Sequence, residues 1–258
     1  MNYSIYPYYA FSEQEPINFY FEKEHFSELQ IICISFGNEL FYGSLDRLKN
    51  NVLDFPFTTS RFYRDTDLKK IPEFWEKHSS FIENNNRGYG YWLWKSFLTL
   101  YTLREMNDND ILFYMDAGCS LNKNGISRFN DYIKKVKECQ SGIVSFRMHH
   151  KQKTYTKMDV LDLFDSSNGD KGQIQATCYF IRKCDKTMKI VQEWYDMCCN
   201  YHLLDDSPSI IPNDGSFIDH RHDQSIWSLI RYKYSAELYE DETYPSHPDY
   251  PIFASRLR

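Results

Sequence analysis

The sequence of 258 residues lacks the features that identify several classes of protein. Its 30 basic and 36 acidic side chains give a net charge of −6, so it lacks the basic excess of a dedicated nucleic-acid-binding protein. No apolar run approaches the roughly 20 residues that cross a bilayer, since the longest are stretches such as residues 31–36. The first 15 residues contain no basic stretch followed by an apolar run, so no secretory signal is expected.

The seven cysteines form no metal-binding pattern, because none of them belongs to a C-x-x-C pair. An odd number of scattered thiols suits a reducing compartment better than a disulfide framework, so we expect a cytoplasmic protein. No internal repeat, low-complexity segment or linker divides the chain. We therefore expect one domain over residues 1–258, with residues 1–28 as an irregular N-terminal wrap.

Aromatic side chains are abundant, with 21 Tyr, 19 Phe and 5 Trp making up 17% of the chain. A chain of this length buries roughly 70–75% of the surface that it exposes when unfolded, so a substantial core is available. The rings are therefore consistent with a ring-packed core, with a ligand site that stacks on sugars or bases, or with both.

Hydrophobic periodicity predicts alternating strands and helices. Short apolar or extended runs predict strands at residues 29–36, 55–62, 111–115, 143–148 and 176–182. Apolar residues at helical spacing predict helices at residues 45–52, 91–106, 126–136, 188–198 and 223–232, and Thr156 with Asp159 predicts a capping box that opens a helix through Phe164. This alternation favours an α/β fold with a mostly parallel sheet, in which ligands bind at the carboxyl ends of strands.

Asp116-Ala117-Gly118 directly follows the most hydrophobic predicted strand. A carboxylate at this position can hold Mg²⁺ or Mn²⁺, and the metal can neutralise a diphosphate leaving group. Gly118 would allow a ligand to approach the backbone closely. The structural alternative is a turn that Asp116 caps and in which Gly118 supplies a positive φ angle.

The segment from Arg87 to Lys95, R-G-Y-G-Y-W-L-W-K, places two glycines before the start of an aromatic helix. Free amides at a helix N-terminus favour anions, so both cations could contact phosphates there. Tyr89, Tyr91 and Trp92 could stack on a base or a sugar. The alternative is a glycine turn that leads into a buried helix, and the spacing excludes a Walker A loop.

Residues 219–225, D-H-R-H-D-Q-S, are polar and precede the last predicted helix. His220 or His222 could complete a metal site begun by Asp116, and Asp223 could hydrogen-bond a sugar or act as a general base. The alternative is that Asp223 caps the helix and the histidines are solvated. Two weaker segments, residues 147–151 and 173–176, flank strands at the same edge, and on their own evidence a structural role is favoured over a functional one.

Taken in order, these segments resemble a group of glycosyltransferases with the GT-A fold. The resemblance rests on an N-terminal apolar strand, R-G-x-G-Y-W-x-W-K at a helix start, a strand ending in D-A-G and a late H-R-H-D-Q-S, and covers roughly residues 29–258. The group is associated with glycan assembly in bacteria and large DNA viruses. The resemblance implies a Rossmann-like, mixed and mostly parallel sheet flanked by helices. It also implies transfer of a sugar from a UDP- or GDP-linked donor to a hydroxyl of a glycan acceptor.

The resemblance further implies roles for individual residues. Asp116 corresponds to the first carboxylate of the family's D-x-D motif and, with His220, would hold Mn²⁺ or Mg²⁺. Asp223 would be the catalytic residue, activating the acceptor hydroxyl if the enzyme inverts or holding the donor sugar if it retains configuration. The donor-binding residues would be Arg87, Tyr91, Lys95, Asp116, Ala117, Gly118 and Gln175.

The sequence departs from the family at Gly118, where a full D-x-D motif has a second acid. Either one carboxylate binds the metal through water or with His220, or the dependence on metal is weak. The same departure and the abundant aromatic residues leave open a catalytically degenerate carbohydrate-binding module of the same fold. A dinucleotide-dependent enzyme is disfavoured, because the first strand ends in Phe36-Gly37-Asn38 without a G-x-G-x-x-G loop. If the acceptor is lipid-linked, we expect the protein to be peripheral to a membrane.

Overall fold

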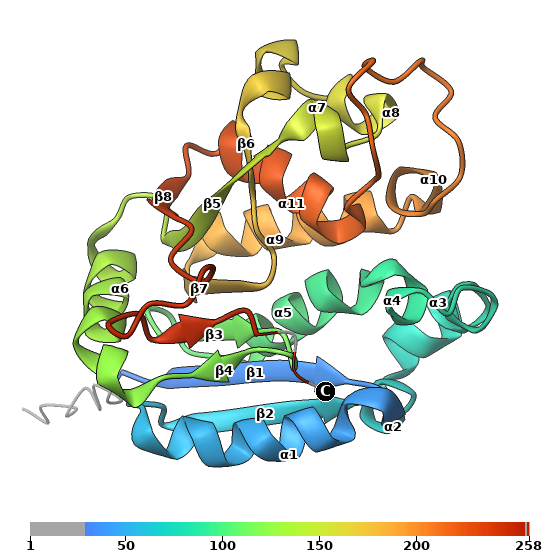
Figure 1. The fold of residues 1–258 in the computed structure, drawn as a ribbon. Helices are drawn as coiled ribbons and strands as arrows, with labels where there is room; N and C mark the ends of the chain where they lie inside the picture. Colours follow the sequence, from blue (N-terminus) through green and yellow to red (C-terminus); the bar gives the residue numbers. More distant parts are fainter. Residues whose placement is uncertain (1–28, 256, 258) are drawn as a thin grey trace, which may run out of the picture.

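The computed structural model describes residues 29–255 and 257, and a seven-stranded sheet lies at its centre (Figure 1). The strands follow the order β2–β1–β3–β7–β5–β6, and β8 pairs with β5. Their bounds are β1 Ile31–Gly37, β2 Thr59–Arg64, β3 Ile111–Met115, β5 Ile143–Lys151, β6 Gly172–Ile174, β7 Cys178–Arg182 and β8 Glu237–Glu240. A second, two-stranded sheet pairs β4 Ser120–Leu121 with β9 Ile252–Phe253. The wrap predicted for residues 1–28 lies outside the described residues.

The directions of the strands place the ends of β1 and β3 and the start of β7 at the same edge of the sheet, its carboxyl edge. β1 is parallel to β2 and β3, and β5 is parallel to β8, whereas β7 is antiparallel to β3 and β5 and β6 is antiparallel to β5. Five of the seven strands therefore run in one direction, which confirms the predicted mixed, mostly parallel sheet. At the carboxyl edge, Met115 pairs with Cys178, and the Asp116 amide donates to the Thr177 carbonyl at 2.8 Å.

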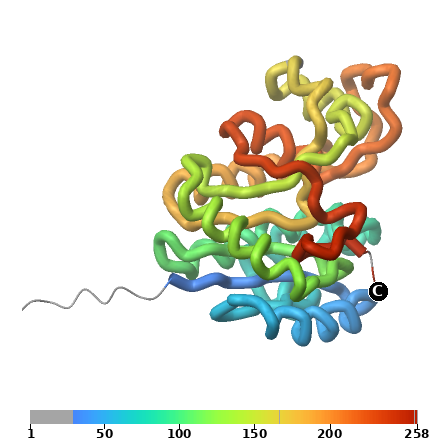
Figure 2. The backbone as a smooth tube through the Cα atoms, turned by 60° about the vertical axis from the view of Figure 1, so that its left-hand side comes forward, coloured from blue at the N-terminus to red at the C-terminus, as the bar shows by residue number. Residues whose placement is uncertain are grey.

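Helices cover both faces of the sheet (Figures 1 and 2). One face packs against α1 Tyr42–Asn51 and α6 Ile126–Glu138. The other packs against α3 Pro72–Asn84, α5 Leu93–Glu105, α9 Asp185–Cys198 and α11 His222–Lys233. Shorter elements connect them: α2 Asp65–Leu68, α4 Gly88–Tyr91, α7 Gln152–Tyr155, α8 Met158–Leu161, α10 Tyr201–Leu204 and the 3₁₀ turns Glu39–Phe41, Val52–Asp54, Lys123–Gly125 and Ser166–Asp170. None of the helices in the described chain is long and apolar enough to cross a membrane.

β3 illustrates why the core contains so many rings. Its side chains alternate, so Leu112 and Tyr114 enter the core beneath α5, while Phe113 enters the core beneath α6. Tyr114 stacks on Tyr179 with 5.0 Å between ring centroids, and Phe113 stacks on Phe180 at 4.5 Å. All seven cysteines are free thiols. A large part of the aromatic excess is therefore structural.

The helix predicted from a capping box at Thr156 through Phe164 is shorter than predicted, and the capping box is absent. The helix there, α8, has four residues and ends at Leu161, and its N-cap residue makes no side-chain capping bond. The carboxylate of Asp159 instead accepts hydrogen bonds from the backbone amides of Ile210 and Ile211, at 2.8 and 2.7 Å. The Asp159 carboxylate, which the sequence pattern assigned to the capping box of the helix, thus binds the distant loop that contains Ile210 and Ile211.

Candidate functional site

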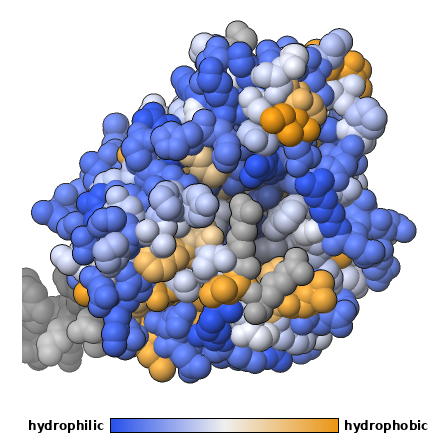
Figure 3. Space-filling view, viewed as in Figure 1, coloured by the Kyte–Doolittle hydropathy of each residue, from blue (hydrophilic) through white to orange (hydrophobic). Residues whose placement is uncertain are grey.

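A cleft of about 1110 Å³ opens at the carboxyl edge of the sheet. Figure 3 shows the molecule from this side, and its surface is hollowed near the centre. The floor is formed by residues at the ends of β1 and β3 and before β7: Gly37, Asn38, Asp116, Ala117, Gly118 and Thr177. The walls combine residues from distant parts of the chain, among them Asn86, Gly88, Tyr89, Trp92, Gln175, Arg221, Gln224, Asp241, Thr243, Tyr244 and Ser255.

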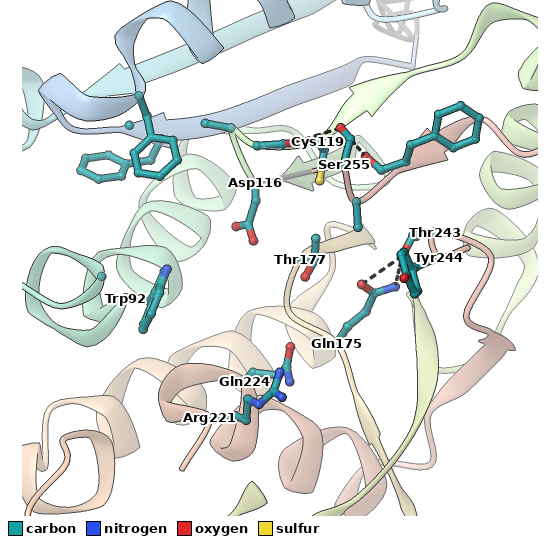
Figure 4. A pocket seen from close by; sticks show the side chains of 18 of the residues that line it. Trp92, Asp116, Cys119, Gln175, Thr177, Arg221, Gln224, Thr243, Tyr244 and Ser255 are labelled. Atoms are coloured by element: carbon teal, nitrogen blue, oxygen red, sulfur yellow. Dashed lines mark hydrogen bonds between the residues drawn. The ribbon is translucent and has the colours of Figure 1, made fainter. Parts of the chain in front are cut away.

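Asp116 projects into this cleft and is held by two neighbours (Figure 4). Its side chain is 33% exposed, whereas that of Lys95 is 4% exposed. Asp116 Oδ1 accepts a hydrogen bond from the Tyr114 hydroxyl at 2.6 Å and lies 2.9 Å from Lys95 Nζ. Lys95 Nζ also donates to the Ala176 carbonyl at 3.1 Å. Burial alone would lower the pKa of Lys95, but Asp116 and Asp223 together raise it above its ordinary value.

Asp223, the predicted catalytic residue, lies behind Lys95 and does not line the cleft. It is the second residue of α11, its side chain is 5% exposed, and Oδ2 is 3.5 Å from Lys95 Nζ. Among the described residues, Oδ2 has no hydrogen-bond partner. Burial raises the pKa of Asp223 to about 7. Asp223 is therefore connected to the cleft through Lys95 and Asp116, while the helix cap is Arg221.

His220, the predicted second metal ligand, is buried and has both ring nitrogens engaged. Nδ1 accepts from the Lys157 amide at 3.2 Å, and Nε2 lies 2.9 Å from the Leu203 carbonyl, to which it donates. Burial lowers the pKa of His220 to about 3, which keeps the ring neutral. His222 is buried as well, so neither imidazole is solvated. The structure does not present His220 to Asp116.

The described residues around Asp116 do not form a closed shell of protein ligands for a divalent cation. Mg²⁺ prefers an octahedral shell of oxygen ligands, but Gly118 has no side chain to offer. Cys119 is a buried thiol whose pKa is raised by burial. No three His, Cys, Asp or Glu side chains in the described part of the chain are grouped to hold a metal. The positive charge beside Asp116 is the ammonium group of Lys95.

Two of the predicted donor-binding residues lie outside the cleft. Arg87 pairs with Asp206 at 2.9 Å and with Asp219 at 3.1 Å. Tyr91 places its ring 4.9 Å from the ring of His222. Neither residue lines the cleft, whereas the other predicted donor-binding residues line it or, like Lys95, lie directly behind it.

The glycine-containing segment is a left-handed turn instead of the regular helix start that the sequence predicts. Five consecutive residues have positive φ angles: Gly88 at 58°, Tyr89 at 55°, Gly90 at 82°, Tyr91 at 53° and Trp92 at 61°. A Cβ at Gly88 would lie 2.4 Å from the Trp92 ring, so only glycine fits there. Because non-glycine residues pay roughly 1–2 kcal/mol for this conformation, the turn stores strain in the cleft wall.

The sequence analysis missed several residues of the cleft. Arg221 and Gln224 belong to H-R-H-D-Q-S, where only the histidines and Asp223 were assigned roles. Thr243 and Tyr244 belong to a C-terminal segment with no hydrophobic period, so the sequence offers no signal for them. This segment returns to the D-A-G loop, where the Leu257 amide donates to the Gly118 carbonyl at 3.0 Å. Figure 2 shows it in red beside the sheet.

No protein-family model matches the sequence, and no match is found among curated proteins. Solved structures with a similar arrangement include a glycosyltransferase involved in the glycosylation of the major capsid of PBCV-1, 10% identical, covering 87% of this chain and 93% of that chain with a TM-score of 0.47. Mouse xyloside xylosyltransferase 1 is 12% identical, with coverages of 83% and 86% and a TM-score of 0.42. The galactosyltransferase LgtC, solved with donor and acceptor sugar analogues, is 11% identical, with coverages of 86% and 86% and a TM-score of 0.44.

Proposed function

We propose that the chain is a GT-A-type glycosyltransferase that moves a sugar from a nucleotide diphosphate sugar to a hydroxyl of a glycan acceptor. The observation that carries this proposal is the cleft at the carboxyl edge, into which Asp116 projects while Lys95 and Tyr114 hold one of its oxygens. Residues of all three motifs that carry the family resemblance line this one cleft, namely Gly88, Asp116 and Arg221 with their neighbours.

The composition of the cleft supports a sugar-containing ligand. Sites for small molecules commonly occupy about 300–1000 Å³ and combine apolar walls with a few polar groups. Here the polar groups are amides and hydroxyls such as Asn38, Gln175 and Thr177, and the rings of Trp92 and Tyr244 lie in the walls. Amides and hydroxyls can hydrogen-bond sugar hydroxyls, while the rings can stack on a sugar or a base.

In the proposed reaction, the acceptor oxygen bonds to the anomeric carbon as the bond from that carbon to the diphosphate breaks. The diphosphate leaves with the electron pair, and the acceptor hydroxyl gives its proton to Oδ2 of Asp116. We assign to Asp116 the carboxylate that faces the reacting sugar, because the Tyr114 hydroxyl and Lys95 engage Oδ1 and leave Oδ2 for the substrate. Asp223 contacts Lys95 instead of the cleft, so we assign it a positioning role.

The test combines a donor screen with one substitution. UDP-, GDP- and TDP-sugars are screened by thermal shift with and without Mn²⁺, since a specific ligand raises the melting temperature. The donor found is then used in a transfer assay, in which Asp116→Asn lowers kcat by about 100-fold or more because the facing carboxylate is lost. Asp108→Asn is the matched control, because Asp108 is 76% exposed and lies outside the cleft. Unchanged transfer by the Asp116→Asn variant would contradict the assignment.

A glycan-binding module without catalysis is the second candidate, and Gly118 in place of a second acid favours it. It predicts that glycans raise the melting temperature while no nucleotide sugar is bound or consumed. The same screen separates the two functions, because only a transferase responds to the donor.

A further inference from the structure

The guanidinium group of Arg221 lines the cleft and has no hydrogen-bond partner among the residues that the structure describes. Figure 4 shows Arg221 and Gln224, at the start of α11, across the cavity from Asp116. Every other arginine in the described chain donates a side-chain hydrogen bond to an oxygen atom of the protein. For Arg221, neither a side-chain hydrogen bond nor an ion pair to the described residues is found, although it carries five N–H donors.

The position of Arg221 is nevertheless fixed. Its guanidinium carbon lies 4.4 Å from the centroid of the Tyr155 ring. Its backbone amide donates to the Tyr155 carbonyl at 3.0 Å and to Ser225 Oγ at 3.2 Å. A guanidinium group that is stacked on a ring and has free donors is suited to bind two oxygens of one anion.

Neither of the two carboxylates that line the cleft among the described residues, Asp116 and Asp241, forms an ion pair with Arg221. Asp116 is paired with Lys95. Asp241 Oδ1 accepts from the Thr243 amide at 2.9 Å and hydroxyl at 2.6 Å, and from the Gln175 amide at 3.3 Å. Both carboxylates are therefore engaged within the protein. Among the Lys and Arg residues of the described chain, Arg221 is the one that lines the cleft.

We propose that Arg221 binds the diphosphate of the donor and that this binding requires no divalent cation. The inference rests on the function proposed above. A departing diphosphate gains negative charge and needs a positive group placed to receive it. The described residues around Asp116 do not form a closed shell of protein ligands for a metal, whereas Arg221 offers an oriented guanidinium group on the facing wall. A carboxylate of an acidic sugar has the same oxyanion chemistry, so the experiment separates these two sources.

Binding of inorganic pyrophosphate, measured by calorimetry in EDTA, is the first readout. We expect Arg221→Gln to weaken it by about 10- to 100-fold, the effect of losing a charge-assisted hydrogen-bond pair. Arg104→Gln is the matched control, because it also removes one arginine charge but lies outside the cleft, paired with the exposed Glu73. Melting temperatures without ligand establish that both variants fold. Undetectable binding to the unchanged protein in EDTA, or equal affinity in the Arg221→Gln variant, would overturn the proposal.

Glucuronate is the second probe and donor transfer the third. If Arg221→Gln loses glucuronate binding but keeps pyrophosphate binding, Arg221 recognises an acidic sugar and the diphosphate assignment is overturned. If transfer proceeds only with Mn²⁺ and Arg221→Gln remains fully active, this inference fails while the transferase function stands. If pyrophosphate binding depends on Arg221 but no nucleotide sugar is consumed, the anion site stands and the transferase function fails.

Discussion

In the part of the chain that the structure describes, two lysines have almost fully buried side chains, and their surroundings differ. Lys157 is 3% exposed, and its ammonium group contacts one carboxylate, that of Asp205, at 3.2 Å. It also donates to the His202 carbonyl at 2.6 Å and to Ser207 Oγ at 3.2 Å. Lys95 is 4% exposed and is shared by two carboxylates, at 2.9 and 3.5 Å. The first cluster lies away from the cleft and the second lies at its floor.

The pair of Lys157 and Asp205 is a balanced, structural ion pair. In the Lys95 cluster, one ammonium group faces two carboxylates, so the charges are not balanced. Burial alone would raise the pKa of Asp205, but the hydrogen bonds from Ser207 and Lys157 hold it below its ordinary value. Asp223 receives too little compensation from Lys95, and burial raises its pKa to about 7. A strongly shifted group beside a cleft is typical of functional sites. We infer that Lys157 anchors the chain around α10, whereas the Lys95 cluster serves the cleft.

The largest expected effect on stability follows from removing either ammonium group. At pH 6, Lys157→Met should lower the free energy of unfolding by about 3–5 kcal/mol, because Asp205 stays charged and loses its buried partner. Lys95→Met should cost less, because Asp223 is already mostly protonated at this pH and Asp116 is partly exposed. Urea denaturation of both variants measures the difference.

Sugar transfer then separates the two lysines. Transfer should survive in the Lys157→Met variant at a temperature where it is folded, and should fall in the Lys95→Met variant. Equal stability losses with equal activities would remove the distinction between the clusters.

The sequence predicts the elements whose apolar faces meet the sheet. β3 has the predicted bounds, and α6 and α9 contain their predicted stripes, because two or more turns of apolar residues face one surface. The helix α3 was missed, although Phe74 and Ile82 lie on one buried face. Between them stands His78, which is buried because the hydroxyls of Tyr195 and Tyr201 contact its ring nitrogens at 2.8 Å each. Because His78 is polar, it interrupts the apolar pattern of α3 in the sequence. Only its distant partners, Tyr195 and Tyr201, make it compatible with the core, so hydrophobic periodicity does not predict this helix.

Residues of the cleft could be predicted from the sequence only where their place next to a predicted strand determines their place in the fold. Asp116 and Gln175 follow or precede strands at the carboxyl edge, and both line the cleft. Arg87 is held outside the cleft by the carboxylates of Asp206 and Asp219. These lie 119 and 132 residues further along the chain, so no local pattern predicts the pairing. The left-handed turn packs Gly90 against α3, where a Cβ would lie 2.7 Å from Ile82 Cγ1, and this is a tertiary contact. Local sequence therefore identified the edge of the sheet but not the partners of its cations.

The pH dependence of stability should differ between buried Asp223 and partly buried Asp205. Asp223 keeps a proton up to about pH 7 in the folded protein, whereas its ordinary pKa is 3.8. The stability from its neutral form is therefore complete below about pH 4 and is lost as the pH rises through 7, by about 1.4 kcal/mol per pH unit for one proton. Asp205 has a lowered pKa, so its contribution is present above its ordinary pKa and is lost at lower pH.

Urea denaturation between pH 4.5 and 7.5 tests this contrast with one variant from each cluster. Asp223→Asn should flatten the decline of stability with rising pH, because the amide stays neutral. Asp205→Asn should lower stability throughout this range and leave the decline in place. A decline that persists unchanged in the Asp223→Asn variant would mean that Asp223 is ionised at neutral pH.

The smallest expected effects concern the hydroxyl that donates to a carboxylate in each cluster. Ser207 donates to Asp205, and Tyr114 donates to Asp116. Ser207→Ala and Tyr114→Phe should each lower the free energy of unfolding by about 1 kcal/mol, the usual value of one such bond. Only Tyr114→Phe should also lower kcat, by about 10-fold, because Asp116 then loses one of the two groups that hold Oδ1. If kcat is unchanged in the Tyr114→Phe variant, Lys95 alone orients Asp116, and the hydroxyl at the cleft is as structural as its counterpart beside Lys157.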